Sequence, residues 1–265
     1  MDPRLEVREV SFTYIDGPVV FSGVSFTVGA GEVFSILGPN GTGKSTLLKC
    51  CGHLLAPSSG EVLIEGRPLA ELSANERAQA LGYVPQTHSP PFPFPVRDFI
   101  AMGRAPYIGL FSTPARDDVD RAEQAMARVG IAHLADRPIT QVSGGERQLA
   151  LIARVLVQEP TIMLLDEPTS HLDFGNQLRI LEVVRSLADE GITCLVATHY
   201  PDHAFITDGR SAILRDRTLS AVGSNQDVIT EENLKRAYGI DVQVREIGPP
   251  VGRRICIPLF SRRGT

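Results

Sequence analysis

The sequence predicts an α/β fold in which a parallel sheet carries an antiparallel β subdomain at its edge and an inserted helical lobe. Three patterns support this prediction. Segments 5–10 and 19–28 alternate between apolar and polar residues, as half-exposed strands do. Segments 33–37 and 162–165 are mostly apolar, as strands buried on both faces of a parallel sheet are. Between them, residues 96–142 show a largely helical pattern, which predicts the inserted lobe.

Turn residues and helical spacing locate the other elements. Asp16, Gly17 and Pro18 interrupt the two alternating segments, which therefore form an antiparallel pair. Apolar residues recur at helical spacing within the lobe at Val119, Ala122, Ala125, Met126 and Val129. The remaining predicted elements are a helix at about 44–54, strands near 61–65 and 81–84, a helix after residue 143, a helix at 176–187, a strand at 192–197 and short elements to about residue 238.

The composition is that of a globular protein without a nucleic-acid partner. Of the 265 residues, 43% are hydrophobic and 22% are charged, which excludes a disordered chain. The 31 acidic residues outnumber the 26 basic ones, so no net positive charge attracts DNA or RNA. Four cysteines lack the paired spacing of metal ligands, which indicates buried thiols in a reducing compartment: Cys50, Cys51, Cys194 and Cys256.

The sequence contains no targeting or membrane-spanning pattern. Met1–Leu5 lacks the basic start and apolar stretch of a secretory signal, and no run of eighteen apolar residues occurs. We therefore expect a cytosolic protein, to which another chain supplies any membrane span.

Prolines set the predicted domain boundaries. His88–Pro95 holds four prolines, which exclude a central strand or a helix interior. We predict a core with its antiparallel subdomain at 1–87 and 143–240, a helical subdomain at 88–142 and a C-terminal tail at 241–265. The tail contains four arginines and is expected to be a solvated end, with a phosphate-binding tail as the alternative: Arg253, Arg254, Arg262 and Arg263.

Residues 38–46 match a glycine-rich phosphate loop, with four residues between Gly38 and Gly43 and then Lys44 and Ser45. Phosphate oxygens need several backbone N–H donors that converge at a helix amino terminus, and small residues leave room for them. Lys44 adds a charge for the outer phosphates, and the Ser45 hydroxyl suits Mg²⁺. The loop predicts a P-loop NTPase-type core, whose expected nucleotide ligands are Asn40, Gly41, Gly43, Lys44, Ser45 and Thr46.

Two acidic residues end the apolar strand at 162–165. Asp166 should emerge at the carboxyl edge of the sheet beside the phosphate loop, where it can hold a metal directly or through water. Glu167 is then placed to polarise an attacking water, because phosphoryl transfer depends mainly on positioning and charge compensation. The alternative is that both carboxylates cap the helix beyond Pro168.

The segment Val142–Gln148, which precedes Asp166, resembles the signature motif of the ATP-binding-cassette family. Ser143, Gly144 and Gly145 open a helix, so free N–H groups form a second anion site. A simple helix cap with Ser143 as N-cap is the alternative. The resemblance implies that these three residues and Glu146 close on the phosphate loop of a second subunit, so that a homodimer sandwiches two ATP molecules.

Further motifs stand in the family's order, and the resemblance covers about residues 5–238. Tyr14 resembles the aromatic residue that stacks on adenine, although a plain sheet residue is the alternative. Gln86 resembles the glutamine that touches Mg²⁺ and the attacking water, and Asp173 resembles the loop residue that crosses the dimer interface. By this resemblance Glu167, His199 and Gln86 are catalytic, and Ser45, Gln86 and Asp166 bind the metal.

His199 resembles the switch histidine that contacts the γ-phosphate at the end of a strand. A metal pair with His203 is a weaker alternative, because Pro201 lies between the two and no third ligand is evident. Three positions depart from the commonest family pattern: Val142 replaces leucine, Glu146 replaces glutamine, and Tyr200–Asp202 follows the histidine where an acid often comes sooner. These departures leave the glycine donors intact and bear on turnover.

The resemblance also implies a machine. The chain has one cassette and only 27 residues after Tyr238, which favours a compact importer subunit. Phe92–Val96 and Ala101–Tyr107 resemble the importer ATPases for iron–siderophore, haem and cobalamin, a group that includes a molybdate importer. This implies ATP hydrolysis at the cytoplasmic face of the cell membrane, on permease subunits fed by a substrate-binding protein. An iron(III)-siderophore or a related metal chelate is the expected cargo.

Two rival functions remain as alternatives. A DNA-repair or chromosome-type ATPase of the same family would carry long coiled-coil arms, but Ser143 follows Lys44 by only 99 residues without sustained heptads. A nucleotide-gated binding module that never hydrolyses ATP would not need the Glu167 carboxylate. We therefore favour a transport ATPase.

Overall fold

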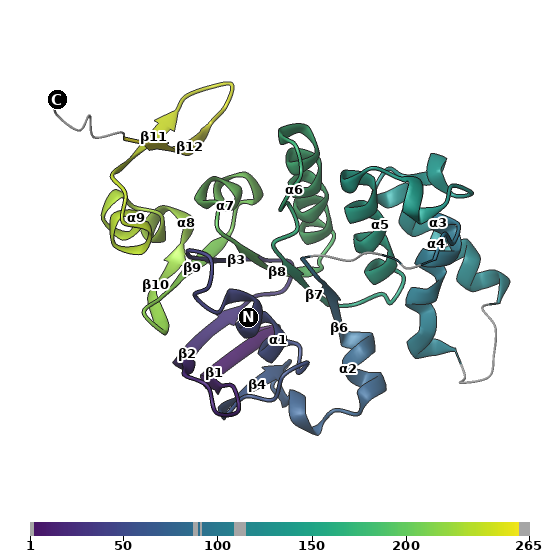
Figure 1. Ribbon diagram of the computed structural model, residues 1–265, viewed down its shortest axis with the longest axis horizontal. Helices are drawn as coiled ribbons and strands as arrows, with labels where there is room; N and C mark the ends of the chain where they lie inside the picture. The colour runs from purple at the N-terminus through teal and green to yellow at the C-terminus, as the bar shows by residue number, and fades with distance from the viewer. Residues whose placement is uncertain (1–2, 87–89, 91, 109–114, 260–265) are drawn as a thin grey trace.

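The computed structural model describes residues 3–86, 90, 92–108 and 115–259, and it arranges them as two packed sheets with helices around them (Figure 1). One sheet is four-stranded, one is six-stranded, and a third pair of strands lies near the C-terminus. The parallel core, the antiparallel subdomain and the helical lobe confirm the predicted α/β fold. The proline-rich segment 88–95 lies partly outside the described residues, as do Arg262 and Arg263 of the predicted tail.

The antiparallel sheet forms from the alternating segments at the amino terminus. Leu5 faces Val28 on one neighbour and Ile64 on the other, and alternate side chains of β1 are buried. The break at Asp16 takes a positive φ of 57° between the first two strands. The sheet has the strand order β2 (Val19–Val28), β1 (Leu5–Thr13), β4 (Ser59–Ile64) and β5 (Arg67–Pro68).

The six-stranded sheet carries the site described below at the carboxyl ends of its parallel strands. Every residue of β3, β7 and β8 is buried, because helix α1 (Lys44–Cys51) packs on one face of the sheet and α6 (Phe174–Asp189) on the other. Only β10 runs antiparallel. The order is β10 (Thr218–Ser224), β9 (Arg210–Arg215), β3 (Val33–Leu37), β8 (Thr193–Thr198), β7 (Ile162–Asp166) and β6 (Leu81–Val84).

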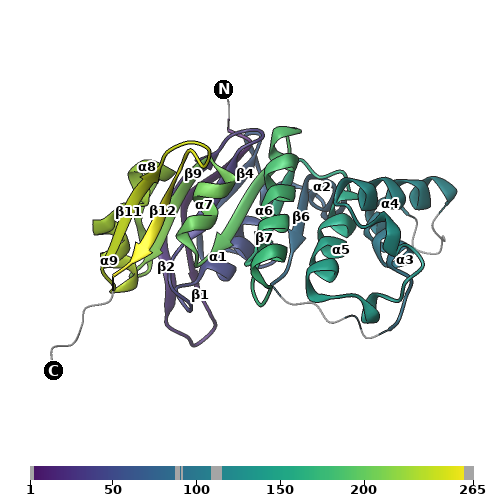
Figure 2. The same cartoon turned by 90° about the horizontal axis from the view of Figure 1, so that it is seen from above.

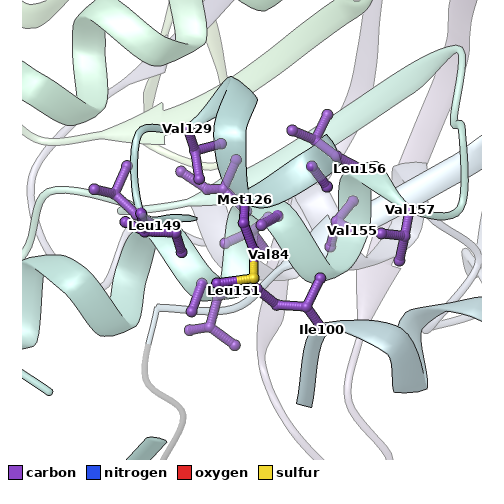
Figure 3. Close-up of a cluster of buried hydrophobic side chains, with 14 of the residues drawn as sticks. Val84, Ile100, Met126, Val129, Leu149, Leu151, Val155, Leu156 and Val157 are labelled. Atoms are coloured by element: carbon purple, nitrogen blue, oxygen red, sulfur yellow. The ribbon is translucent and has the colours of Figure 1, made fainter. Parts of the chain in front are cut away.

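The helical lobe packs against one edge of this sheet, at the right of Figure 1. Of the five apolar residues at helical spacing, Val119 is half-buried and the other four are buried. Figure 3 shows Met126 among side chains from α5 and from Val84 of β6. The lobe consists of α3 (Val96–Ala101), η2 (Met102–Tyr107), α4 (Arg116–Arg128), η3 (Ala132–Leu134) and η4 (Ile139–Gln141), followed by α5 (Gly144–Leu156).

The predicted domain boundary at residue 143 stays a prediction. Helix α5, which follows this boundary, packs in one buried cluster with α3 and α4 of the lobe and also with the sheet. Helix α1 ends three residues before the predicted Leu54, since Gly52 caps it and donates its N–H to Leu48 O. The structure also contains η1 (Leu69–Glu71), α2 (Ala74–Ala80) and α7 (Pro201–Thr207), which the sequence patterns did not separate.

Residues 242–258 of the predicted C-terminal tail contain two strands. After α8 (Asn225–Val228) and α9 (Glu231–Tyr238), strands β11 (Val242–Ile247) and β12 (Arg253–Pro258) form an antiparallel hairpin (Figures 1 and 2). The N–H of Cys256 donates to Asp202 at the start of α7 at 2.8 Å. The tail prediction was wrong here because alternating strands of modest hydropathy gain their stability from partners that the local sequence does not reveal.

Cys50, Cys51 and Cys194 are buried free thiols, and Cys256 is partly buried. Burial raises the pKa of Cys50 to about 12, so this thiol stays protonated and unreactive. Among the described residues, no helix is long and apolar enough to cross a membrane. In the same part of the chain, no three His, Cys, Asp or Glu side chains gather into a metal-binding group.

Candidate functional site

The phosphate loop connects β3 to α1 and ends in a left-handed glycine. Gly43 has φ +100°, a conformation that favours glycine, and a Cβ there would lie 2.6 Å from a Val20 methyl, which would have to move. Leu47 N–H donates to Gly43 O at 2.8 Å, and the amides that precede it in α1 have no intrahelical partner. These amides give the loop its capacity for phosphate oxygens.

The Lys44 side chain is 4% exposed and folds back on its own loop. Its ammonium donates to Gly38 O at 2.8 Å and Pro39 O at 2.9 Å, and lies 3.6 Å from Glu167 Oε1. Burial lowers the pKa of Lys44, while the carboxylates of Glu167 and Asp166 oppose this shift. The charge therefore has carbonyl partners that a phosphate can replace.

Ser45 and Asp166 meet at the carboxyl edge of the sheet. Ser45 Oγ donates to Asp166 Oδ1 at 2.7 Å, and Tyr83 Oη donates to Asp166 Oδ2 at 3.0 Å. Burial, followed by the nearby carboxylate, raises the pKa of Tyr83, so its hydroxyl remains a donor. A hydroxyl and a carboxylate oxygen side by side are the hard donors that Mg²⁺ prefers, so these residues fit the ion. The sequence analysis missed Tyr83, which the same β6 segment supplies three residues before Gln86.

The Glu167 carboxylate is the centre of a hydrogen-bonded group. Its Oε2 accepts from Ser170 Oγ at 2.8 Å and Gln86 Nε2 at 3.2 Å, and it lies 3.1 Å from His199 Nδ1. Burial alone raises the pKa of Glu167, but the hydrogen bond from Ser170 and the charges of Lys44 and His199 outweigh it, so the pKa lies below its usual value. Glu167 is therefore ionised at neutral pH.

The backbone conformation of Glu167, the first residue after β7, directs its side chain towards these hydrogen-bonding partners. Its φ is +45°, an uncommon conformation for a residue with a side chain, and its N–H still donates to Ala197 O at 2.9 Å. The sheet thus holds the backbone while the side chain points across the carboxyl edge. The alternative of a helix cap for the two acids does not describe these contacts, because Asp166 and Glu167 bind side chains from the loop and from neighbouring strands.

Tyr14 lies at the mouth of the loop on the antiparallel sheet. Its ring is 49% exposed, its Oη lies 3.2 Å from Thr46 Oγ1, and its edge packs on Phe12 with ring centroids 4.8 Å apart. A cavity of about 490 Å³ extends from this ring to Glu167. The cavity is lined by Tyr14, Val20, Asn40, Gly41, Gly43, Lys44, Ser45, Thr46, Gln86 and Glu167.

The signature segment does not line that cavity. Ser143 caps α5: its Oγ accepts from Glu146 N at 3.3 Å, and Glu146 Oε2 accepts from Ser143 N at 2.8 Å. These hydrogen bonds with Ser143 lower the pKa of Glu146. The glutamate that replaces the family's usual glutamine thus completes a capping box. Ser143 and Gly144 are exposed, and the amides of Gly144 and Gly145 take no part in the capping box.

Asp173 lies beside the signature in the same chain. It caps α6 by accepting from Asn176 N at 2.8 Å, and this bond lowers its pKa. A Cβ on Gly145 would lie 2.3 Å from Asn176 Oδ1, so a larger residue at 145 would have to displace the Asn176 side chain. The segments of residues 143–146 and 173–176 therefore form one edge, apart from the cavity at the phosphate loop.

His203 does not pair with His199 around a metal. Its Nδ1 lies 3.3 Å from both Thr169 Oγ1 and Thr198 Oγ1, and burial together with the charge of His199 lowers its pKa to about 4. It is a buried, neutral residue behind the site. A separate cavity of about 410 Å³ between α6, α7 and β12 contains none of the predicted site residues.

Comparisons with known proteins identify the family of the chain. The sequence profile of the ABC transporter family matches residues 21–170. The hemin import ATP-binding protein of Nocardia farcinica is 38% identical, over 91% of this chain and 82% of that protein. The ferric enterobactin transport ATP-binding protein of Escherichia coli is 35% identical, over 86% of this chain and 84% of that protein. A solved metal-chelate type ABC transporter in an inward-facing conformation matches with a TM-score of 0.87 and 31% identity, over 98% of both chains.

Proposed function

The chain belongs to the ABC transporter family as an ATP-binding subunit that hydrolyses ATP to drive transport, and from this premise we propose how its residues act and what they move. The observation that carries the residue roles is the Glu167 carboxylate, ionised and held by three side chains beside Lys44 and the Ser45–Asp166 pair. We assign Glu167 as the residue that orients the attacking water and accepts its proton.

The other residues around the cavity bind and align the nucleotide. The adenine stacks on Tyr14, and the amides of residues 40–46 receive the phosphates together with Lys44, whose ammonium leaves the carbonyls of the loop. Ser45, Gln86 and Asp166 would hold Mg²⁺, which when bound compensates the charge of the outer phosphates. His199 contacts the terminal phosphate, and its bond to Glu167 Oε2 fixes the direction of that carboxylate.

The second anion site completes the function in a homodimer. Ser143 caps a helix start whose first amides, those of Gly144 and Gly145, line no part of this chain's own nucleotide cavity. Supplied to the phosphate loop of a second copy, with Asp173 crossing between the copies, these amides would close over the ATP. The Glu146 carboxylate bonds to its own helix start and leaves the amides of Gly144 and Gly145 free.

We propose that the transported cargo is a metal chelate taken up across the cell membrane. The support is similarity: relatives named for hemin import and ferric enterobactin transport align over most of the chain, and so does the metal-chelate type transporter. The ATPase would work on the cytoplasmic face beneath permease subunits fed by a substrate-binding protein. Among these cargoes, an iron(III)-siderophore is our first candidate, followed by haem, cobalamin and molybdate.

The chromosome-type alternative has less support. Between the phosphate loop and the signature, the longest helix among the described residues is α4, with 13 residues, far shorter than a coiled-coil arm needs. The acidic net charge of −5 also disfavours DNA.

The test is ATPase activity of the chain reconstituted with candidate permeases, with and without binding proteins loaded with siderophore, haem, cobalamin or molybdate. Stimulation by one loaded binding protein supports import and names the cargo. The Lys44→Ala chain in the same vesicles controls for contaminating ATPases. If no loaded binding protein stimulates a reconstituted complex that hydrolyses ATP, the importer assignment is wrong.

A further inference from the structure

Helix α9 contacts the first residue of the phosphate loop. Gly38 N–H donates to Tyr238 Oη at 3.1 Å, although the two residues stand 200 positions apart. Tyr238 is the last residue of α9 and lies outside the segment 21–170 that matches the family profile. The sequence pattern assigns no role to Tyr238, which stands where the family resemblance ends.

Both polar groups of the Gly38 backbone are occupied, by different parts of the molecule. The N–H binds Tyr238, and the carbonyl accepts from the Lys44 ammonium at 2.8 Å. A Cβ on Gly38 would lie 2.5 Å from Leu214 O of β9, so the residue is also closely packed. When Lys44 turns towards phosphate it must leave the Gly38 carbonyl, and the Tyr238 hydroxyl then remains at the other side of the residue.

Tyr238 is itself held in place by its surroundings. It packs on a buried cluster that contains Leu37, the residue directly before the loop, and Leu234 of its own helix. The Arg215 guanidinium donates to the carbonyl of Ala237 next to it. Burial raises the pKa of Tyr238, with smaller contributions from Cys256 and Glu167, so the phenol keeps its proton at neutral pH. The hydroxyl is therefore a neutral, fixed acceptor.

We propose that Tyr238 is a positioning residue for ATP binding: its hydroxyl fixes the first peptide of the phosphate loop in the conformation that receives the phosphates. This inference rests on the ATP-binding function and adds the C-terminal helix to the parts of the chain that serve it. The contribution is preorganisation, because a loop that is already ordered loses less conformational freedom when the nucleotide binds.

The test compares Tyr238→Phe with Tyr107→Phe in the full chain. Both changes remove one phenol hydroxyl; that of Tyr107 donates to Gln158 O at 2.7 Å in the helical lobe, away from the nucleotide cavity. We expect Tyr238→Phe to raise the Kd and KM for MgATP roughly threefold to tenfold, the size of one lost hydrogen bond. The kcat at saturating ATP should stay within about twofold, because the Glu167 group is intact.

Hydrogen exchange supplies a second readout that general destabilisation does not mimic. Amides in residues 33–43 should exchange faster in nucleotide-free Tyr238→Phe than in wild type or Tyr107→Phe, while the melting temperatures of the two variants stay equal. Unchanged MgATP affinity and unchanged exchange in Tyr238→Phe would overturn the proposal. Equal losses of affinity in both variants would also overturn it, in favour of a general effect on stability. Failure of the wild-type chain to bind MgATP would instead refute the proposed function.

Discussion

The phosphate loop and the signature segment are both helix amino termini with small residues, yet the rest of the chain treats them differently. Around the start of α1, side chains from several strands converge, including Asp166, Glu167 and His199. At the start of α5, Ser143 and Glu146 bond mainly to each other and face solvent. Charged side chains from other elements of the same chain thus surround the start of α1, whereas the start of α5 has backbone amides and the Glu146 carboxylate of its own helix.

We propose from this difference that the two helix starts are unlike parts of one composite site. A nucleotide at α1 would find the water-orienting carboxylate, a lysine and hard metal donors in reach. A phosphate at α5 would find outward amides and no catalytic group among the described residues around the cap. In the head-to-tail dimer that we propose, each of these helix starts would meet the complementary one of the other copy.

The largest expected effect comes from a change at Glu167, in the proposed catalytic group near the start of α1. Glu167→Gln removes the carboxylate charge but keeps the size of the side chain and one acceptor oxygen. We expect the ATPase rate to fall about 10²-fold to 10⁴-fold, the range for loss of a positioned general base, while ATP-driven dimerisation persists. Steady-state phosphate release and size-exclusion chromatography with ATP measure the two outcomes.

The matched control for this change is Glu71→Gln, because Glu71 is exposed and has no hydrogen bond or ion pair recorded in the described part of the chain. It should keep the wild-type rate. Near-normal turnover in Glu167→Gln would contradict the role that we assign to Glu167. It would also contradict our proposal that the catalytic group lies at the start of α1.

The next test places one substitution in the signature segment and one in the phosphate loop. In a mixed dimer, one copy carries Ser143→Arg and the other carries Lys44→Ala. If each phosphate loop uses the partner's signature, both defects fall in one composite site and the other site stays intact. When both changes sit in the same copy, each composite site receives one defect. We expect one high-affinity MgATP per dimer in the first arrangement and none in the second.

Calorimetric titration of tagged, purified mixed dimers counts these sites. The expected loss at a damaged loop is about tenfold to a hundredfold in affinity, because hydrogen bonds from a charged donor contribute roughly 1.5–3 kcal/mol. The opposite result, with one intact site only when both changes share a copy, would contradict the head-to-tail pairing and make the signature act on its own chain.

The smallest expected effect is on stability and comes from His203, which is buried behind the site. The pKa of His203 is lowered to about 4 in the folded chain, below the ordinary value of 6.5. Between these values the unfolded chain binds a proton that the folded chain does not, so stability falls as the pH drops from 6.5 towards 4. We expect a loss of about 2 kcal/mol in the free energy of unfolding between pH 7 and pH 5 from this residue.

Urea denaturation of wild type and His203→Asn at the two pH values measures this loss. The variant should keep polar contacts with Thr169 and Thr198 but show a smaller pH dependence. His133→Asn is the control, because His133 is exposed near the signature and its replacement should leave the pH dependence as in wild type. An identical pH dependence in all three proteins would show that His203 is not the buried titrating group.

Local patterns predicted most of the fold. The predicted strands at 19–28, 33–37 and 81–84 have the observed bounds, because alternation or a mostly apolar run reflects the faces that each strand buries. The hairpin at 242–258 was missed for the opposite reason. Its strand residues other than Val242 are half-exposed or exposed, and its arginines suggested solvent, while its backbone donates hydrogen bonds to Asp202 of α7 and Glu231 of α9.

The site was predicted as a set of separate motifs, and the structure assembles part of that set. Lys44, Glu167 and His199 lie together, as strand ends on one edge of a parallel sheet must. Ser143 and Asp173 lie together on another edge. Their functional roles stay predictions, and the mixed dimers test the division between the two groups.

The sequence by itself determined what short stretches of chain control: the glycine loop at a helix start, the serine cap of α5 and the apolar strands that end in acids. These depend on neighbouring residues, whose spacing is set by the backbone. Only the tertiary structure decided that Tyr83 binds Asp166 and that Tyr238 binds Gly38. A phenol in a strand or helix has no local partner, so its contact is selected by which distant backbone group the packed sheets and helices bring within hydrogen-bonding distance.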